Sequence, residues 1–149
     1  MRLISIYPEY AKLIKRGSKK YEFRKLIAKK SLQNILKEKY IAVYETSPTS
    51  AITMVISVDE VLIDGISNLW SKYGKHSGVD ESYFRDYYKD RTKGVAIKIK
   101  KVFLIKNPIK IVKIRSIYPN FNPPQNFYSL NEEQYPFIYK KLLKFLKKP

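Results

Sequence analysis

The sequence contains no cysteine and a single histidine, His76. The lack of cysteine excludes disulfide bonds and thiolate metal sites. A structural zinc site or a Ser-His-Asp triad would depend on His76, which has the usual spacing of neither. No apolar run approaches the roughly 18 residues that suggest a membrane span. The apolar start of the chain is too short for the core of a signal peptide. We therefore expect a soluble cytoplasmic protein with no membrane association, metal or cofactor.

Acidic residues are also scarce. The 149 residues include 13 Asp and Glu against 30 Lys and Arg, so the formal net charge is +17 and the sequence pI is near 9.9. Such an excess favours a polyanionic partner, and nucleic acid is the first candidate. A lysine-rich composition also arises from genomic base bias or a hot habitat, so part of the charge has another explanation.

The residues that are plentiful indicate a packed core. The hydrophobic fraction is 44% and the aromatic fraction 14%, and the length predicts one domain over residues 1–149. Alternating or β-branched runs predict about five or six strands, near residues 3–6, 21–25, 39–45, 51–63 and 94–105, with 109–114 as a further strand or edge segment. Helical patterns separate them without a regular strand–helix–strand repeat. This favours an α+β fold, a small mixed β-barrel with peripheral helices, over a doubly wound sheet.

The helices are predicted over residues 8–16, 31–37, 67–73, 81–89 and about 131–148. Polar residues at their starts are expected to cap four of them, namely Ser31, Ser67, Asp80 and Asn131. We expect a turn at Asn107–Pro108, a bend near residues 58–59 and an ordered extended loop over 117–130. The last helix is basic around an apolar stripe, so its lysines are expected to extend the charged surface.

The segment 17–25 changes from helical to strand periodicity. A short helix ends at Gly17, and from Lys20 the side chains alternate between two faces. Tyr21 and Phe23 point to one face, and the other carries Lys20, Glu22 and Arg24. If the aromatic rings take the core, Glu22 lies between two cations, with Lys19 on the lip of the turn. This pattern fits either a compact polar site or a solvated strand face with a cross-strand ion pair.

Several segments, in order, carry a resemblance to a known family. They are residues 4–11 with Ile14, 17–24, 44–48 with 51–52, 69–74 with 83–88, 96–99, and 123–130. The segment 17–24 matches the signature G-x-K-x-x-E-x-R. Together these segments span roughly residues 3–130 and resemble the ASCH domain family, whose fold is that of the PUA-like β-barrels.

The resemblance implies an RNA-binding module with a cleft beside the barrel, lined by Lys19, Glu22 and Arg24. Some members of the family are enzymes. One branch hydrolyses the acetyl amide of N4-acetylcytidine with a lysine, a threonine and a glutamate, and another has ribonuclease activity. Lys19 matches the catalytic lysine. Glu22 stands at the threonine position and the segment aligned with the glutamate reads His76-Ser77-Gly78, so this chemistry would require Glu22 to take a catalytic role.

One hypothesis is therefore a module that binds RNA or single-stranded nucleic acid. Phosphates would meet the basic residues Lys12, Lys15, Arg16, Lys19, Lys20, Arg24 and Lys25. Glu22 would accept hydrogen bonds from a base edge, and Tyr44 or Tyr21 would stack on a base, although the alternation places Tyr21 in the core. Ser47 is expected to be a further contact with the nucleic acid. The alternative is that the lysines form only a solvated surface.

The second hypothesis is an enzyme acting on RNA or a modified nucleoside, with Lys19 and Glu22 as catalytic residues. Thr46, Ser47 or Ser77 would lie nearby as hydroxyl nucleophiles. A ribonuclease without a metal would stabilise phosphate charge with Lys19 and Arg24 and use Glu22 or His76 as base. A histidine on a loop is more often an ordinary surface residue. Trp70, at helical spacing with Leu69 and Tyr73, is more typical of a core residue than of a platform on which a base stacks.

Overall fold

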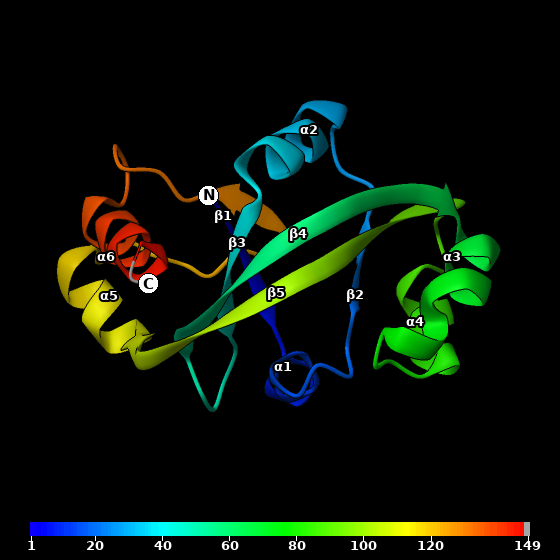
Figure 1. Cartoon of the computed structure of the whole chain (residues 1–149), viewed down its shortest axis with the longest axis horizontal. Coiled ribbons are helices and arrows are strands. Elements are labelled where there is room, and N and C mark those ends of the chain that lie inside the picture. The colour runs from blue at the N-terminus through cyan, green and yellow to red at the C-terminus, as the bar shows by residue number, and fades with distance from the viewer. Residues whose placement is uncertain (148–149) are drawn as a thin grey trace.

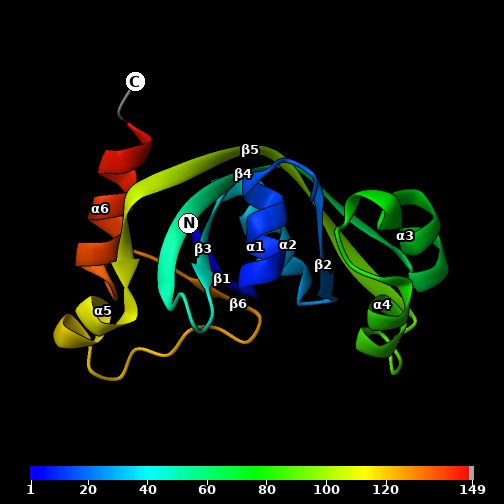
Figure 2. The ribbon, with the colours of Figure 1, turned by 90° about the horizontal axis from the view of Figure 1, so that it is seen from below.

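The computed structural model describes residues 1–147 and contains one curled, six-stranded sheet. The strands lie in the order β2-β5-β4-β3-β1-β6, with only β1 and β3 parallel. Their bounds are Arg2–Ile6 (β1), Tyr21–Lys25 (β2), Tyr40–Glu45 (β3), Ala51–Gly65 (β4), Lys93–Lys110 (β5) and Phe127–Ser129 (β6). The predicted mixed β-barrel is confirmed, as an open half-barrel that arches over α1 (Figure 2).

Six α-helices and one 3-10 turn surround the sheet in the described part of the chain (Figure 1). They are α1 (Pro8–Lys15), α2 (Lys29–Glu38), α3 (Ile66–Tyr73), η1 (Gly74–His76), α4 (Glu81–Tyr87), α5 (Ile111–Ile117) and α6 (Pro136–Leu146). None of the helices within residues 1–147 is long and apolar enough to cross a membrane. Lys148, the predicted end of the last helix, lies outside the described residues.

The inside of the half-barrel holds the first part of the core. Alternate residues of β1 and β3, such as Ile4 and Val43, point inward and meet apolar side chains of β4 and β5. Ala11 and Ile14 of α1, together with Leu32 and Ile35 of α2, belong to the same cluster. Figure 1 shows α1 and α2 at opposite ends of the strands, so the two helices close the two ends of the half-barrel.

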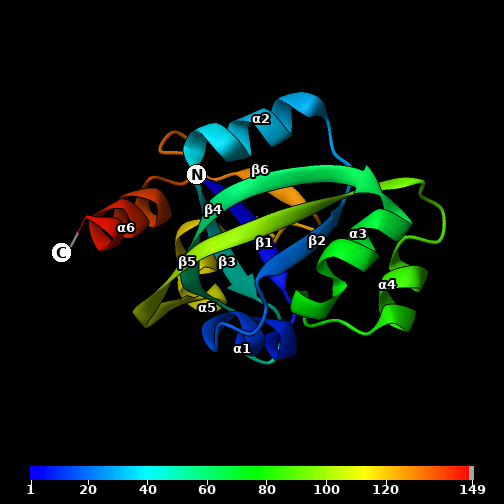
Figure 3. The same ribbon diagram turned by 45° about the vertical axis from the view of Figure 1, so that its right-hand side comes forward.

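Two further clusters cover the outside of the sheet. Helices α5 and α6 pack on the outer face of β1 and β3 through buried residues that include Ile114 and Ile138, and Phe121 from the loop after α5 joins them. Helices α3 and α4 pack on β2 and β5 instead, and Phe84 meets Phe23 with ring centroids 4.8 Å apart. The Tyr88 hydroxyl donates to the carbonyl oxygen of Arg24 at 2.6 Å. These contacts fix the α3–α4 unit beside β2, at the opposite end of the molecule from α5 and α6 (Figure 3).

The sequence prediction is wrong between residues 107 and 117. Instead of a turn at Asn107–Pro108 followed by a strand, β5 continues to Lys110 and α5 follows. The register explains how β5 accommodates Pro108: Met54 pairs with Leu104 but Ile52 pairs with Ile109, so β5 bulges between them. A bulge tolerates the proline because an unpaired residue there needs no ladder hydrogen bond. The bend near residues 58–59 is confirmed as a register shift.

The predicted helix starts are mostly displaced. α2 begins at Lys29 after Ala28, α3 begins at Ile66 after Gly65, and Asp80 precedes α4 without a side-chain cap bond. α6 begins only at Pro136, because Asn131 instead forms a turn in which its Oδ1 accepts from the Gln134 amide at 2.8 Å. The extended loop over 117–130 is ordered as expected, with the buried ring of Phe121, but it ends in the unpredicted strand β6.

The Tyr88 hydroxyl provides a test of how α4 is held on β2. Tyr88→Phe removes the hydrogen bond to the Arg24 carbonyl and keeps the ring, so the free energy of unfolding should fall by about 1–2 kcal/mol in urea denaturation. Tyr73→Phe in the same unit is the control, because no hydrogen bond of its hydroxyl is found within residues 1–147. It should change stability by less than about 0.5 kcal/mol. Equal effects of the two substitutions would contradict this account.

Candidate functional site

A cleft of about 480 Å³ opens between the edge strand β2 and strand β1. Its charged lining consists of Lys19, Glu22 and Arg24, from β2 and the turn that precedes it. A second group of lining residues is aromatic, with Tyr7, Tyr10, Tyr83 and Tyr87 from the start of α1 and from α4. The remaining walls include Ser5, Thr46 and the segment 123–125. The cleft therefore combines a charged cluster with a row of tyrosines.

The turn between α1 and β2 places Lys19 inside the protein. Gly17 ends the helix with a left-handed φ of +78°, which a glycine adopts without strain. The Lys19 amide then donates to the Leu13 carbonyl, and the Lys20 amide donates to the His76 carbonyl at 2.7 Å. Gly78 lies against this turn, because a Cβ there would approach the Lys19 Cβ to 3.4 Å. Lys19 is consequently only 2% exposed, so its predicted position on the lip of the turn is wrong.

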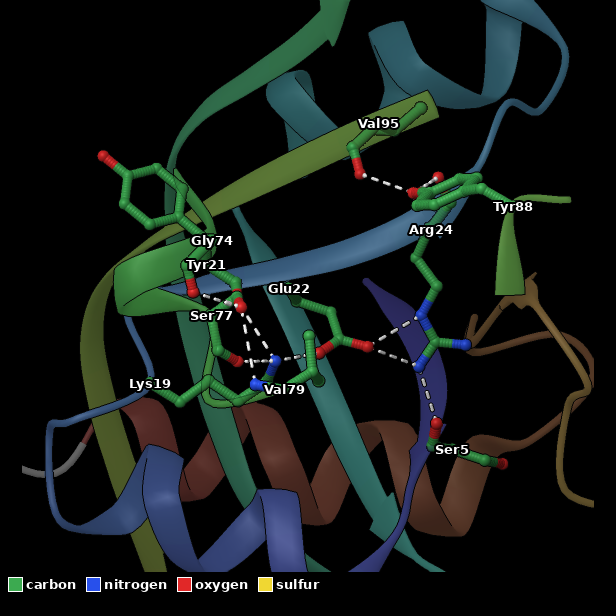
Figure 4. A network of polar contacts seen from close by, with 10 residues as sticks. All are labelled: Ser5, Lys19, Tyr21, Glu22, Arg24, Gly74, Ser77, Val79, Tyr88 and Val95. Atoms are coloured by element: carbon green, nitrogen blue, oxygen red, sulfur yellow. Dashed lines mark hydrogen bonds and ion pairs between the residues drawn. The ribbon is translucent and has the colours of Figure 1, made fainter. Parts of the chain in front are cut away.

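Glu22 is the centre of a buried ion network (Figure 4). Its Oε1 accepts from Arg24 Nε and Nη2, both at 3.0 Å, and its Oε2 lies 3.0 Å from Lys19 Nζ. The side chains of Glu22 and Arg24 are each about 10% exposed. The alternation predicted for β2 is confirmed, since Phe23 packs on the α3–α4 side while Glu22 and Arg24 share the opposite face.

The pKa of Glu22 reflects two opposing effects. Burial raises the pKa, while the charges of Lys19 and Arg24 and their hydrogen bonds lower it, and the net pKa lies below the ordinary value of 4.5. Glu22 is therefore ionised at neutral pH and can only accept hydrogen bonds. A carboxylate with a lowered pKa is a weak general base.

The donors of Lys19 are fully used. Besides Glu22, its ammonium group donates to the Tyr21 carbonyl at 3.0 Å and to the Ser77 carbonyl at 2.5 Å. An ammonium group has three N–H donors, so none remains for another acceptor in this arrangement. A lysine acting as base or nucleophile must instead be a free amine. The geometry thus makes Lys19 a residue that positions Glu22.

Arg24 links strands β2 and β1, which do not pair through their backbones. Its Nη2 donates to the Ser5 carbonyl at 2.6 Å, and its Cζ lies 5.6 Å from the ring centroid of Phe127 in β6. No hydrogen bond of Arg24 Nη1 is found within residues 1–147, so this nitrogen is available to a ligand in the cleft. Arg24 therefore both closes the half-barrel and lines the cleft.

The tyrosines form a continuous row along one side of the cleft. Ring centroids are 6.3 Å apart for Tyr7 and Tyr10, 5.7 Å for Tyr10 and Tyr83, and 6.5 Å for Tyr83 and Tyr87. Tyr7 is 55% exposed and Tyr83 is 43% exposed, which is unusual for such large rings. Burial raises the pKa of the Tyr83 hydroxyl to about 12, so it remains a hydrogen-bond donor at neutral pH. These rings offer both stacking surfaces and donors.

Of the predicted nucleic-acid contacts, the structure brings Lys19, Glu22 and Arg24 together in the cleft. The other basic residues lie outside its lining: Lys12, Arg16 and Lys20 are exposed, Lys15 pairs with Glu45, and Lys25 lies over the ring of Tyr87. Ser47 is exposed in the turn after β3, next to Thr46, which lines the cleft. The basic residues thus flank the cleft or point elsewhere, and do not form it.

Three expectations about individual side chains are corrected. Tyr44 is 5% exposed and packs in the cluster beneath α5 and α6, so its ring has no free face for a base. Ser77 is fully buried and its hydroxyl donates to the Gly74 carbonyl at 2.7 Å, so it is not a free nucleophile. His76 is exposed and does not line the cleft, so it does not supply a base there. Trp70 packs on Phe84, as expected for a core residue.

The tyrosine row is not predicted from the sequence. The residue pattern alone indicates no functional role for Tyr10, Tyr83 or Tyr87. A signal was present, because α4 carries two aromatic pairs at i, i+4 spacing, Tyr83 with Tyr87 and Phe84 with Tyr88. The two pairs lie on adjacent stripes of a two-turn helix. Since Phe84 and Tyr88 fill the core, the other pair is left facing the cleft.

Comparisons with known proteins show what this chain is similar to. A model of the ASCH domain matches residues 4–103. A Zymomonas mobilis protein described as an ASCH domain-containing ribonuclease is 30% identical over 132 residues, which are 89% of this chain and 85% of that protein. The crystal structure of ASCH from Zymomonas mobilis superposes with a TM-score of 0.80 at 29% identity, covering 96% of this chain and 93% of that one.

A more distant likeness concerns the fold alone. The N-terminal domain of Staphylothermus marinus McrB has a TM-score of 0.57 at 10% identity, covering 94% of this chain and 93% of that one. Substantially different sequences thus adopt this curled sheet.

The lowered pKa of Glu22 leads to a pH-dependent prediction. A carboxyl whose pKa is lower in the folded than in the unfolded chain stabilises the fold at any pH above its pKa in the unfolded chain, near 4.5. This stabilisation is lost as the pH falls through the pKa of the carboxyl in the folded chain. Glu22→Gln leaves Lys19 and Arg24 without their counterion and should reduce the free energy of unfolding by about 3 kcal/mol at pH 7. The difference from the wild type should shrink below about pH 4. A difference that is the same at pH 7 and pH 3 would contradict the assignment.

Proposed function

Because this chain belongs to the ASCH domain family and has the α+β fold of PUA-like domains, we propose that it binds RNA in the cleft between β2 and β1. The observation that supports this most strongly is the row of tyrosines beside the Glu22–Arg24 pair, in which Tyr7 and Tyr83 are about half exposed. Proteins recognise single-stranded RNA by stacking unpaired bases on aromatic rings and by hydrogen bonds to base edges. The cleft offers both kinds of contact in a volume typical of small-ligand sites.

The fixed charges of the cleft suit a base edge. Glu22 is ionised and Oε2 has Lys19 as its only partner within residues 1–147, so this oxygen can accept from an exocyclic amine. Arg24 Nη1 would donate to a neighbouring carbonyl or ring nitrogen, or to a phosphate. Since Lys19 and Ser5 hold these groups in place, little side-chain entropy is lost when a base binds.

The basic residues around the cleft would contact the phosphates on either side of the bound nucleotide. Lys12 lies exposed on α1, Arg16 directly after that helix, and Lys20 directly before β2. Each phosphate that they neutralise releases counterions, so affinity should fall steeply with salt. Such contacts add affinity without sequence preference, whereas the cleft would supply the selectivity.

A second candidate function is ribonuclease activity. The observation in its favour is the 30% identity to the Zymomonas mobilis protein described as a ribonuclease. Cleavage without a metal needs a general base for the 2′-hydroxyl of the RNA. The cleft provides charge and hydroxyl donors, but Glu22 has a lowered pKa and Lys19 donates to three acceptors, so neither is a ready base. For the same reason the hydrolysis of N4-acetylcytidine is not favoured. We therefore propose RNA binding, in preference to catalysis, as the function.

Stacking on Tyr83 can be tested directly. Tyr83→Ala should weaken binding of a labelled single-stranded RNA about fivefold or more, because stacking on one aromatic ring contributes about 1–3 kcal/mol. Tyr83→Phe keeps the ring and is the matched control, expected to bind within about threefold of the wild type. Fluorescence anisotropy across a salt series measures the RNA affinities of both variants. Unchanged affinity in Tyr83→Ala would remove the tyrosine row from the interface.

The same RNA, analysed on a denaturing gel after incubation, distinguishes binding from cleavage. We expect intact RNA from the wild-type protein. Shortened RNA in amounts that follow the affinities of the Tyr83 variants would instead establish the cleft as a ribonuclease site. Cleavage that is equal in all variants would point to a contaminating nuclease.

A further inference from the structure

Three buried side-chain oxygens in the described chain have neither a hydrogen bond nor an ionic partner. They are Ser5 Oγ, Thr46 Oγ1 and Asn126 Oδ1. Native proteins rarely leave buried polar atoms unpaired, because each loses its hydrogen bonds to water without a replacement. An orphaned atom therefore calls for an explanation, and three in one region call for a common one.

The strand register places these three residues side by side. Ser5 and Thr46 lie on the neighbouring parallel strands β1 and β3, where the Thr46 amide donates to the Ile6 carbonyl at 3.0 Å. Ile4 pairs with Phe127 in the antiparallel β1–β6 ladder, so one further step places Asn126 opposite Ser5. Residues opposite one another in a ladder point to the same face, and Thr46 continues the face of Tyr44, the partner of Ser5. All three side chains therefore share the outer face of the sheet, the face of Tyr44, at the ends of the strands, whereas Glu22 and Arg24 lie on the inner face.

This polar group adjoins the cleft described above. Ser5 and Thr46 line that cleft, and so does Gln125, the residue before Asn126. Figure 4 shows the Ser5 side chain pointing away from the guanidinium group that its carbonyl oxygen binds, so its hydroxyl is not part of the Glu22 network. The three oxygens thus form a separate set of hydrogen-bonding atoms beside the cleft.

We propose that Ser5, Thr46 and Asn126 form a subsite that accepts a neutral hydrogen-bond donor of the bound nucleotide, either a ribose hydroxyl or a base N–H. This inference rests on the proposed RNA binding. All three oxygens can accept a hydrogen bond, and the set contains no cation that would compensate a phosphate. A neutral donor would therefore satisfy them where an anion would not.

The subsite needs a small movement to receive a ligand. The three oxygens are buried, so a bound group reaches them only when a neighbouring part of the protein shifts, and we infer that this part is the segment 123–126. This segment precedes β6 and lies outside the sheet ladders, so its displacement breaks no strand pairing. Its own residues 123–125 line the cleft, which places the moving part in contact with the ligand.

One substitution, Thr46→Val, should have different effects on thermal stability and on RNA affinity. Thr46→Val keeps the shape of the side chain and removes a hydroxyl that has no partner, so the melting temperature should stay the same or rise. The affinity for a labelled single-stranded RNA should nevertheless fall about three- to tenfold, the effect of one lost hydrogen bond. The matched control is Thr53→Val, because the Thr53 hydroxyl donates to Glu45 inside the protein. That variant should lose thermal stability and keep its affinity for RNA.

Three other results would overturn the inference. If Thr46→Val lowers the melting temperature and binds RNA as tightly as the wild type, the hydroxyl is structural. If the wild type binds RNA, and neither Thr46→Val nor the second variant Ser5→Ala loses affinity, the subsite fails while the proposed function stands. If the wild type binds no RNA at all, the proposed function fails and the subsite with it.

Repeating the titration with DNA of the same sequence distinguishes a ribose 2′-hydroxyl from a base N–H as the bound donor. If the 2′-hydroxyl is the donor, wild type should prefer RNA and Thr46→Val should lose that preference. If a base N–H is the donor, Thr46→Val should weaken RNA and DNA binding by the same factor.

Discussion

The hydrogen bond from Arg24 to the Ser5 carbonyl is the contact on which the arrangement of the cleft depends. β2 is one edge of the sheet and β6 the other, and no backbone ladder joins the two edges. β6 is short and its pairing with β1 ends at Ile4, which leaves the next carbonyl of β1 accessible to Arg24. The half-barrel is thus closed by side chains, and the cleft lies between β2 and the part of β1 that β6 does not pair.

Closing a sheet with charged side chains has consequences for what the cleft can do. Arg24 reaches Ser5 only because Glu22 orients its guanidinium group, and Glu22 is in turn held by Lys19. Breaking one member of such a buried network leaves an uncompensated charge, so the three residues stabilise the fold together. The same constraint keeps Glu22 ionised and fixed as an acceptor. A site that is rigid and charged before the ligand arrives is well suited to recognition and poorly suited to supplying a base.

The sequence was informative where local pattern decides the structure. The alternation over residues 20–25 predicted which side chains of β2 share a face, and the matching segments predicted the barrel. Prediction from the sequence failed where contacts between residues far apart in the chain decide the structure. Lys19 is buried because one of its acceptors is the Ser77 carbonyl, 58 residues further along the chain. Tyr44 is buried because α5 and α6 cover its strand, and α5 was itself predicted as an extended segment. No local pattern around these residues contains that information.

The central claim is that RNA occupies the cleft between β2 and β1, and nuclear magnetic resonance tests it most directly. We would titrate a short single-stranded RNA into isotope-labelled protein and follow the amide signals together with the Arg24 Nε–H signal. The account predicts the largest shifts at Glu22, Arg24 and Tyr83, with smaller ones over residues 123–126. Shifts confined to exposed lysines of α2 and β5, with the Arg24 signal unmoved, would contradict it and would reduce the interaction to nonspecific charge attraction.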